Sequence, residues 1–490
     1  MQKDELKGIA FNGIKWSTVG TFGRAFFQLL QIAVLTRFLP KEAFGQIAMA
    51  LFVINFTNIF VDMGFTSAIL HQQNATSKEY NSVFWFNLFL SFVLFAIVAA
   101  LAPLVSSFYN EPELEFILII LGINIILLAI GRVHRTILQK EFRFKQITIV
   151  DIISLIIGLI IAILLAMSNF GVYSLVYSTL SISLISSIFL VIFNAQTHPI
   201  KFHFRFKELL PFLNVGSFSM GSQIISFFST DIDVLIIGKT MGPGPLGLYS
   251  LSKQFIFKFY SIINPIVTNV LSPILSSIQN DKIKIKGYYL KIVSLLTTIN
   301  IPLYLLIAVL SSEILTIVYG TEYAEAKIIL SFLSIVYLVN SISNPVGSLQ
   351  IATGRTDIGL KWALLSLIIT PGVIYLASLV NINTVALYRA ILSLIMIIPL
   401  WFIQLRPMAN ISLKEYFNQF YKPLLFFLGA TLLIYLLGDK TEITNNILLD
   451  GIIKTCITLM AFGIFVLSFD RKSVFETYHL IISTINRKKK

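Results

Sequence analysis

The sequence predicts an all-α protein that crosses a membrane many times. Of its 490 residues, 56% are hydrophobic and 12% are charged, whereas an ordinary soluble domain carries about 25% charged residues. The mean hydropathy is +0.84, and apolar runs recur from Phe11 to Phe469. A spanning helix needs about 20 mostly apolar residues. This composition excludes a soluble domain with one anchor, and we predict about 14 transmembrane helices.

The apolar runs fall into three groups along the chain. The first six runs are 16–39, 44–70, 83–108, 114–138, 147–168 and 171–194. The next six are 209–238, 246–278, 289–318, 327–353, 358–380 and 383–405, and two more follow at 420–438 and 447–469. We therefore expect a first lobe over 1–200, a second lobe over 201–410, and a C-terminal part over 411–490 with two added helices and a basic tail.

The basic residues predict the orientation of these helices. With the N-terminus placed in the cytoplasm, 27 of the 37 Lys and Arg residues fall on the cytoplasmic side, six fall outside and four lie within helices. Retained Lys and Arg on cytoplasmic loops are the usual orientation signal. Both termini are therefore expected in the cytoplasm, and the net charge of +13 reflects membrane orientation and does not indicate a nucleic-acid partner.

A weak internal repeat relates the two predicted lobes. At an offset of 202, Phe44-Gly45 aligns with Leu246-Gly247 and Arg37 aligns with Lys239. Each lobe has six helices and so starts on the same side of the membrane. The lobes are then related by an axis along the membrane normal, which is the parallel-repeat arrangement of some secondary transporters. This arrangement predicts a cavity between the lobes and alternating access.

The sequence lacks the motifs of several functional classes. The single cysteine, Cys456, lies in a late apolar run, which excludes an intramolecular disulfide and a cysteine metal site. The histidines lack metal-ligand spacing, and no Walker or dinucleotide-binding glycine pattern occurs. No predicted loop could house a catalytic domain. We expect no cofactor, no metal and no enzymatic activity.

Charged residues inside the predicted spans are the candidate functional residues. A charge near the bilayer centre costs at least about 2.5–3.5 kcal/mol, so it should face protein or water. Cations suit an anionic head group such as a diphosphate, and carboxylates suit a coupling proton or Na⁺. The candidates for substrate binding are Arg24, Lys258, Lys253 and Arg389, and the candidates for ion coupling are Asp231, Asp233 and Asp62.

Each candidate also has a structural interpretation. Asp231 and Asp233 lie at about the same depth as Lys253 on the next helix, so an ion pair across that hairpin is one alternative. Asp62 lies toward the cytoplasmic end of its helix, where it would be solvated or paired with Arg24. Lys258 has no acid at its depth on the neighbouring helix and is the stronger ligand candidate.

Several segments resemble one family of transporters. They are Leu39-Pro40-Lys41-Glu42-Ala43-Phe44-Gly45-Gln46, Asp62-Met63-Gly64-Phe65, Ile69-Leu70-His71-Gln72, Phe108-Tyr109-Asn110-Glu111-Pro112 and Gly354-Arg355-Thr356-Asp357. In this order they resemble bacterial polysaccharide flippases of the Wzx type, in the teichuronic/colanic-acid exporter branch of the multidrug/oligosaccharidyl-lipid/polysaccharide exporter superfamily. The resemblance runs from about residue 8 to 410.

The resemblance implies a lipid-linked oligosaccharide flippase of the bacterial cytoplasmic (inner) membrane. Such proteins move undecaprenyl-pyrophosphate-linked repeat units to the outer leaflet by alternating access, using an ion gradient of protons or sodium. The implied partners are the lipid-linked oligosaccharide, membrane lipid, a polysaccharide polymerase and glycosyltransferases. On this analogy Arg24 and Lys258 would bind the pyrophosphate.

Three alternatives remain open at this point. A multidrug or toxin antiporter of the same superfamily would favour an acidic cavity for cationic drugs. A membrane polymerase or glycosyltransferase would need a large outer loop or an acidic metal motif. A non-transporting membrane scaffold would tolerate replacement of both Arg24 and Lys258.

Overall fold

The computed structural model describes residues 3–72, 75–279, 281–438, 453–458, 460–461 and 464, and the regular secondary structure of these residues is all helical. The helices of the first half are α1 (Lys3–Leu35), α2 (Lys41–Asp62), α3 (Phe65–His71), α4 (Ser77–Tyr109), α5 (Glu113–Lys140), α6 (Phe144–Met167), α7 (Tyr173–Asn194) and α8 (Phe206–Met241). Those of the second half are α9 (Pro243–Ser277), α10 (Lys282–Val309), α11 (Ser311–Val318), η1 (Thr321–Ala326), α12 (Lys327–Ser343), α13 (Val346–Thr353), α14 (Thr356–Ser378), α15 (Ile382–Ile395), α16 (Ile397–Leu400), η2 (Trp401–Leu405), α17 (Arg406–Ala409), α18 (Leu413–Phe417) and α19 (Tyr421–Gly438).

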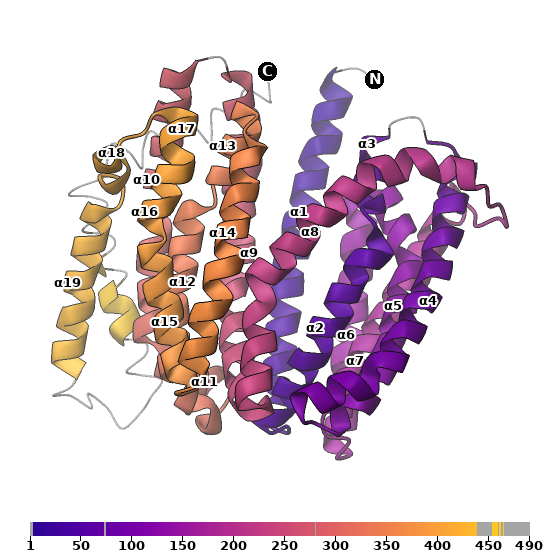
Figure 1. Cartoon of the computed structure of the whole chain (residues 1–490), viewed down its shortest axis with the longest axis horizontal. Coiled ribbons are helices and arrows are strands. Elements are labelled where there is room, and N and C mark those ends of the chain that lie inside the picture. The colour runs from indigo at the N-terminus through magenta and orange to yellow at the C-terminus, as the bar shows by residue number, and fades with distance from the viewer. Residues whose placement is uncertain are drawn as a thin grey trace. The chain divides into compact units, whose positions relative to one another are not determined.

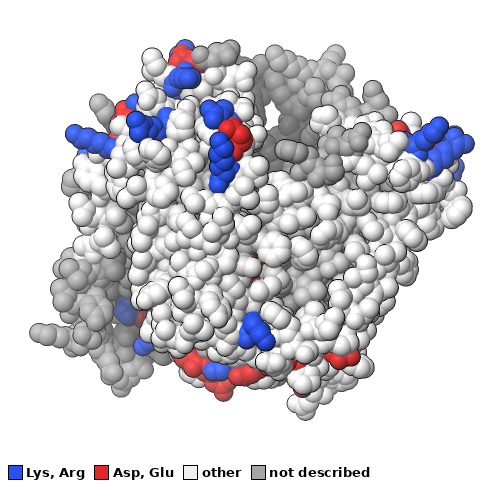
Figure 2. All heavy atoms as spheres, viewed as in Figure 1, with Lys and Arg blue, Asp and Glu red and all other residues white. Residues whose placement is uncertain are grey.

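Eleven helical segments among the described residues are long and apolar enough to cross a membrane. On the face drawn in Figure 2, charged side chains lie near the helix ends and the band over the helix middles carries almost none. The chain is therefore an all-α, multi-pass membrane protein. The last span predicted from the sequence, 447–469, lies largely outside the described residues.

The chain divides into two compact units, Met1–Ser250 and Leu251–Lys490. This division falls about 50 residues after the predicted lobe boundary at 200/201, because α8 packs on α2, α3 and α4 of the first unit. The division into lobes over 1–200 and 201–410 rests on the internal repeat and stays a prediction.

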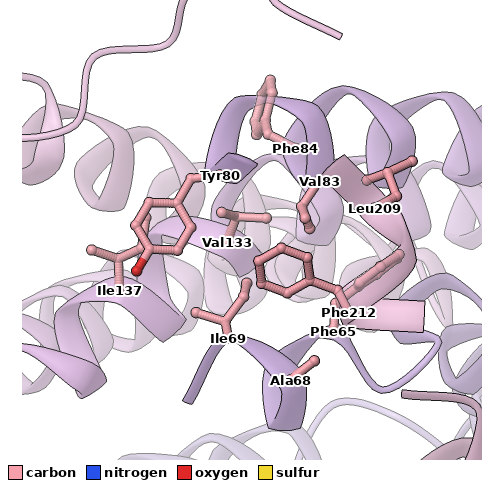
Figure 3. Close-up of a cluster of buried hydrophobic side chains, with 10 residues drawn as sticks. All are labelled: Phe65, Ala68, Ile69, Tyr80, Val83, Phe84, Val133, Ile137, Leu209 and Phe212. Carbon is pink, nitrogen blue, oxygen red and sulfur yellow. The ribbon is translucent and has the colours of Figure 1, made fainter. Parts of the chain in front are cut away.

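Within the first unit, α5 is the central helix. It packs against α4, α7 and α2, while α6 joins α7 to α1 (Figure 1). A buried cluster gathers side chains of α3, α4 and α5 around Leu209 and Phe212 of α8, as Figure 3 shows. Burial of these apolar side chains is what attaches the start of α8 to the first unit.

Glycines let α8 approach the break between α2 and α3. The predicted single span 44–70 is two helices, because Met63 and Gly64 both adopt left-handed backbone angles, with φ of 41° and 72°. A Cβ at Gly64 would overlap the backbone of Gly216 on α8, and a Cβ at Gly216 would overlap the Met63 carbonyl oxygen. Two glycines facing each other therefore permit a contact between backbones.

The second unit is built around α10 and α12. These two helices pack together, α15 packs on α12 and α14, and α19 packs on α10. The predicted span 327–353 is again two helices, α12 and α13, which meet at Asn344-Pro345. Proline lacks the backbone N–H that a continuous helix needs, which accounts for a break at this point.

Candidate functional site

An aspartate and two arginines meet inside the first unit. Arg135 of α5 binds both carboxylate oxygens of Asp151 on α6, with N–O distances of 2.8 and 2.7 Å. Arg24 of α1 donates to the same carboxylate at 2.6 Å. Only 8% of the Asp151 side chain is exposed, whereas 36% of Arg24 and 33% of Arg135 are exposed. One buried acid therefore holds two accessible cations.

A second ion pair lies one helical turn along α5. Arg132 lies 3.4 Å from the carboxylate of Asp62 at the end of α2, and it donates to the backbone and side-chain oxygens of Asn58 at 3.2 and 3.1 Å. The hydroxyl of Thr66 on α3 donates to Asp62 at 2.6 Å. The predicted pairing of Asp62 with Arg24 is therefore wrong, because each residue has a different partner.

We call Arg24, Arg132, Arg135, Asp62 and Asp151 the arginine group. It carries three positive and two negative charges. Arg24, Arg135 and Asp151 all lie on segments that are able to span a membrane. A charge in such a segment must be paired or face water, and one cation remains after the two acids are counted. Guanidinium groups bind carboxylate and phosphate through paired hydrogen bonds. The group is therefore suited to an anion that reaches the exposed sides of Arg24 and Arg135.

In the second unit, the candidate cations lie on α9 and α15. Lys253 and Lys258 are both partly buried on α9. Arg389 is also partly buried on α15, and its Nε is shielded from solvent without a hydrogen-bond partner. Within the described residues, no carboxylate lies within 4 Å of Arg389.

The two aspartates of α8 differ in their surroundings. Asp233 is 1% exposed and accepts a hydrogen bond of 2.8 Å from the hydroxyl of Tyr249. Asp231 is partly buried two residues earlier. The contact between Asp233 and Tyr249 ties the end of α8 to the start of α9 within the first unit. Neither aspartate joins the arginine group described above.

Sequence reasoning found Arg24 but missed Arg132, Arg135 and Asp151. It counted all three with the cytoplasmic loops, because they lie near the ends of predicted spans. The available signal was the Arg132-x-x-Arg135 spacing, which places two cations on one face of a helix. No group of three or more His, Cys, Asp or Glu residues in the described parts of the chain is placed to hold a metal ion.

Comparison with known families shows to which family the chain belongs. A family model described as polysaccharide biosynthesis protein matches residues 34–328, which is more than half of the chain. The chain belongs to the polysaccharide biosynthesis protein family. The match covers the whole arginine group except Arg24.

Several named bacterial proteins are similar to this chain over most of its length. The teichuronic acid biosynthesis protein TuaB of Bacillus subtilis (strain 168) is 27% identical over 435 residues, covering 88% of this chain and 89% of TuaB. The lipopolysaccharide biosynthesis protein WzxC of Escherichia coli (strain K12) is 24% identical over 434 residues, covering 88% of each chain. The succinoglycan biosynthesis transport protein ExoT of Rhizobium meliloti (strain 1021) is 25% identical and covers 74% of this chain and 73% of its own.

Solved structures share the fold of this family member. The lipid II flippase MurJ in an inward closed conformation matches with a TM-score of 0.76 and 17% identity, over 94% of this chain and all of that one. An inward-facing multidrug resistance transporter of the MATE family matches with a TM-score of 0.57 and 16% identity, over 76% of this chain and 92% of its own. At these identities the likeness concerns the fold alone.

Proposed function

We propose that this protein is a flippase that moves undecaprenyl-pyrophosphate-linked oligosaccharide repeat units from the cytoplasmic to the outer leaflet, for surface polysaccharide biosynthesis. The observation that carries the proposal is the arginine group of the first unit. Its two partly exposed guanidinium groups, Arg24 and Arg135, share the single buried carboxylate of Asp151. They retain a positive charge inside apolar helices, where an anionic head group must be stabilised during its passage.

A diphosphate fits this arrangement chemically. It carries several negative oxygens, and arginine binds phosphate oxygens through two parallel hydrogen bonds. Asp151 holds the two guanidinium groups in position before the ligand arrives, which lowers the entropy cost of binding. Arg132 is less exposed and bound to Asp62 and Asn58, so we assign it a supporting role.

The family and its relatives support this substrate class. The names of TuaB, WzxC and ExoT refer to the synthesis or transport of surface polysaccharides, and the fold is shared with a lipid II flippase. On this proposal the protein works in the bacterial cytoplasmic membrane, where glycosyltransferases would supply its substrate and a polysaccharide polymerase would consume its product.

The proposed orientation has both termini in the cytoplasm. The distribution of Lys and Arg along the chain supports it, because 27 of 37 fall on one side of the predicted spans. Transport would proceed by alternating access of two lobes, coupled to protons or sodium, with Asp62, Asp231 and Asp233 as candidate coupling residues.

Reconstituted vesicles test the proposal. Purified protein is placed in vesicles that contain an undecaprenyl-pyrophosphate-linked oligosaccharide, and an impermeant glycan-modifying enzyme reports its appearance on the other leaflet. Arg24→Gln and Arg135→Gln should each reduce translocation at least about tenfold, the effect of losing one charge-assisted contact, at equal protein amounts. Arg355→Gln is the matched control, because Arg355 is exposed and paired with Asp357. Wild-type protein that translocates no lipid-linked glycan would refute the proposal.

Multidrug export is the rival, because the fold is shared with a multidrug transporter. Cationic drugs would be repelled by the surplus positive charge on Arg24 and Arg135. We therefore expect no efflux of ethidium from cells that express the protein. Efflux that persists in Arg24→Gln and Arg135→Gln would favour the rival.

A further inference from the structure

The surface of α9 differs from that of a helix that faces lipid. On α4, the exposed side chains in the apolar span include Phe89, Phe92, Ile97 and Leu104, as expected against lipid tails. On α9 the exposed and partly exposed side chains along one face are Gln254, Phe257, Lys258 and Ser261. The exposed amide of Gln254 at this depth requires water or a polar ligand.

This face lies at the middle of a long helix. Phe257 is 14 residues from the start of the 35-residue helix α9, or about 21 Å along its axis. A helix of this length is long enough to cross a bilayer, and we expect a residue near its middle to lie at the depth of the hydrocarbon region. A polar face at that depth lines an aqueous passage in preference to lipid.

Three aromatic rings are ordered on this face. The rings of Phe257 and Tyr260 stack at 24° with centroids 6.0 Å apart. Tyr337 of α12 packs edge-on against both, at 6.2 and 5.7 Å. Tyr337 is 7% exposed, whereas Phe257 is 42% exposed. The buried Tyr337 therefore packs behind the stacked pair, and the ring of Phe257 remains partly exposed. We call these three rings the aromatic platform.

Amide groups border the aromatic platform. Asn344, which follows α12, donates to the hydroxyl of Tyr260 at 2.7 Å, and Asn340 is exposed one turn earlier on α12. Gln254 is exposed one turn before Phe257. Amides both donate and accept hydrogen bonds. The combination of an open aromatic face with neighbouring amides matches a sugar ring, which has an apolar C–H face and hydroxyl groups at its edge.

We propose that Phe257, Tyr260 and Tyr337, with Gln254 and Asn340, bind a sugar ring of the lipid-linked oligosaccharide. The proposal rests on the proposed function and adds a glycan subsite on the second unit, formed by residues that do not bind the diphosphate. The open ring of Phe257 stacks on the C–H face of the sugar, and the amides hydrogen-bond to its hydroxyls. Stacking tolerates different sugars, because it depends on the ring face and not on one hydroxyl pattern.

A binding comparison tests the subsite. The probes are undecaprenyl pyrophosphate without sugar and a panel of undecaprenyl-pyrophosphate-linked oligosaccharides with neutral and acidic repeat units. Wild-type protein in detergent should bind at least one of the oligosaccharides more tightly than the bare lipid. Phe257→Leu should weaken binding of that glycosylated probe about threefold to tenfold, the effect of losing one aromatic contact, and leave the bare lipid unchanged. Phe257→Trp should retain the preference.

The control variants separate this subsite from the proposed diphosphate site. Phe89→Leu removes an even more exposed phenylalanine from the apolar face of α4 and should change the binding of neither probe. Arg24→Gln should weaken both probes, and its failure to do so would count against the proposed function alone. Equal effects of Phe257→Leu on the two probes, no effect on either, or a wild-type protein that does not distinguish them would overturn the glycan subsite.

Discussion

Gly45 and Gly247 form a reciprocal close contact. A Cβ added at Gly45 would overlap the carbonyl oxygen of Pro243, and a Cβ added at Gly247 would overlap that of Lys41. Residues 41 and 45 correspond to residues 243 and 247 at the offset of 202 found in the sequence. The two contacts are therefore equivalent under the repeat, as expected for a pseudo-twofold axis. The parallel relationship between the two lobes stays a prediction.

Alanine at either glycine should destabilise the protein. Each Cβ would meet a backbone atom that cannot rotate away, so the start of α2 and the start of α9 would have to separate. We expect Gly45→Ala and Gly247→Ala each to cost about 1–3 kcal/mol of unfolding free energy, as for other overpacked sites. Thermal unfolding of the purified protein measures the effect.

The matched control for these variants is Gly221→Ala on α8, because a Cβ there meets nothing within 4 Å. It should be neutral or stabilising by up to about 1 kcal/mol, since alanine favours a helix. Equal melting temperatures for Gly45→Ala and Gly221→Ala would contradict the close contact.

Asp151→Asn should destabilise the arginine group. The variant removes the negative charge that two guanidinium groups share, and it weakens the paired hydrogen bonds to Arg135. Loss of one member of a buried ion pair costs about 3–5 kcal/mol. We expect about 1–3 kcal/mol here, because a third of each arginine side chain is exposed and solvent screens its charge.

The control for Asp151→Asn is Asp357→Asn, whose acid is half exposed beside Arg355. An ion pair between exposed side chains contributes little to stability, because solvent screens both charges. A larger fall in melting temperature for Asp357→Asn than for Asp151→Asn would show that the Asp151 group is not a structural centre.

The sequence predicted the fold more completely than the site. Long apolar runs specify spanning helices by themselves, and a lone cation such as Arg24 is conspicuous within one. Arg135 and Asp151 lie close to the ends of apolar runs, where composition does not distinguish a loop from a buried pair. Their role depends on α1, α5 and α6 lying side by side, which apolar periodicity alone does not specify.

The local backbone geometry at Met63 and Gly64 also could not be predicted from the sequence. Met63 precedes Gly64 at the break between α2 and α3, and a methionine with φ of 41° is not expected from residue preference. The packing of α8 on the first unit depends on this break and on Gly216. The sequence contains both glycines, but their contact is set by tertiary structure.

Tyr249→Phe should destabilise the hairpin between α8 and α9. It deletes the hydroxyl that donates to the nearly fully buried Asp233 at 2.8 Å. Hydrogen bonds to charged groups contribute about 1.5–3 kcal/mol. We expect a loss in that range, measured by thermal unfolding, whereas Tyr375→Phe at a half-exposed position on α14 should have no effect. An unchanged melting temperature of the Tyr249→Phe variant would indicate that the hydroxyl adds nothing to stability.

The ion pair between Lys286 and Glu415 predicts a defined pH dependence. The ammonium of Lys286 lies 2.6 Å from the Glu415 carboxylate. The hydrogen bond from Lys286, with those from the backbone and side chain of Ser412, lowers the pKa of Glu415 to about 2. A lowered carboxyl pKa adds stability that is fully present above the unfolded pKa of about 4.3 and is lost as the pH falls through about 2.

Glu415→Gln therefore has an effect that depends on pH. Between pH 8 and pH 5.5 the variant should be less stable than wild type by a constant amount, below about 1 kcal/mol because both side chains are partly exposed. Below about pH 4.3 the difference should shrink, since wild-type Glu415 then loses the advantage of its lowered pKa. Thermal unfolding of both proteins across this pH range measures it. A difference that grows on acidification would mean that the carboxylate is not the stabilising form.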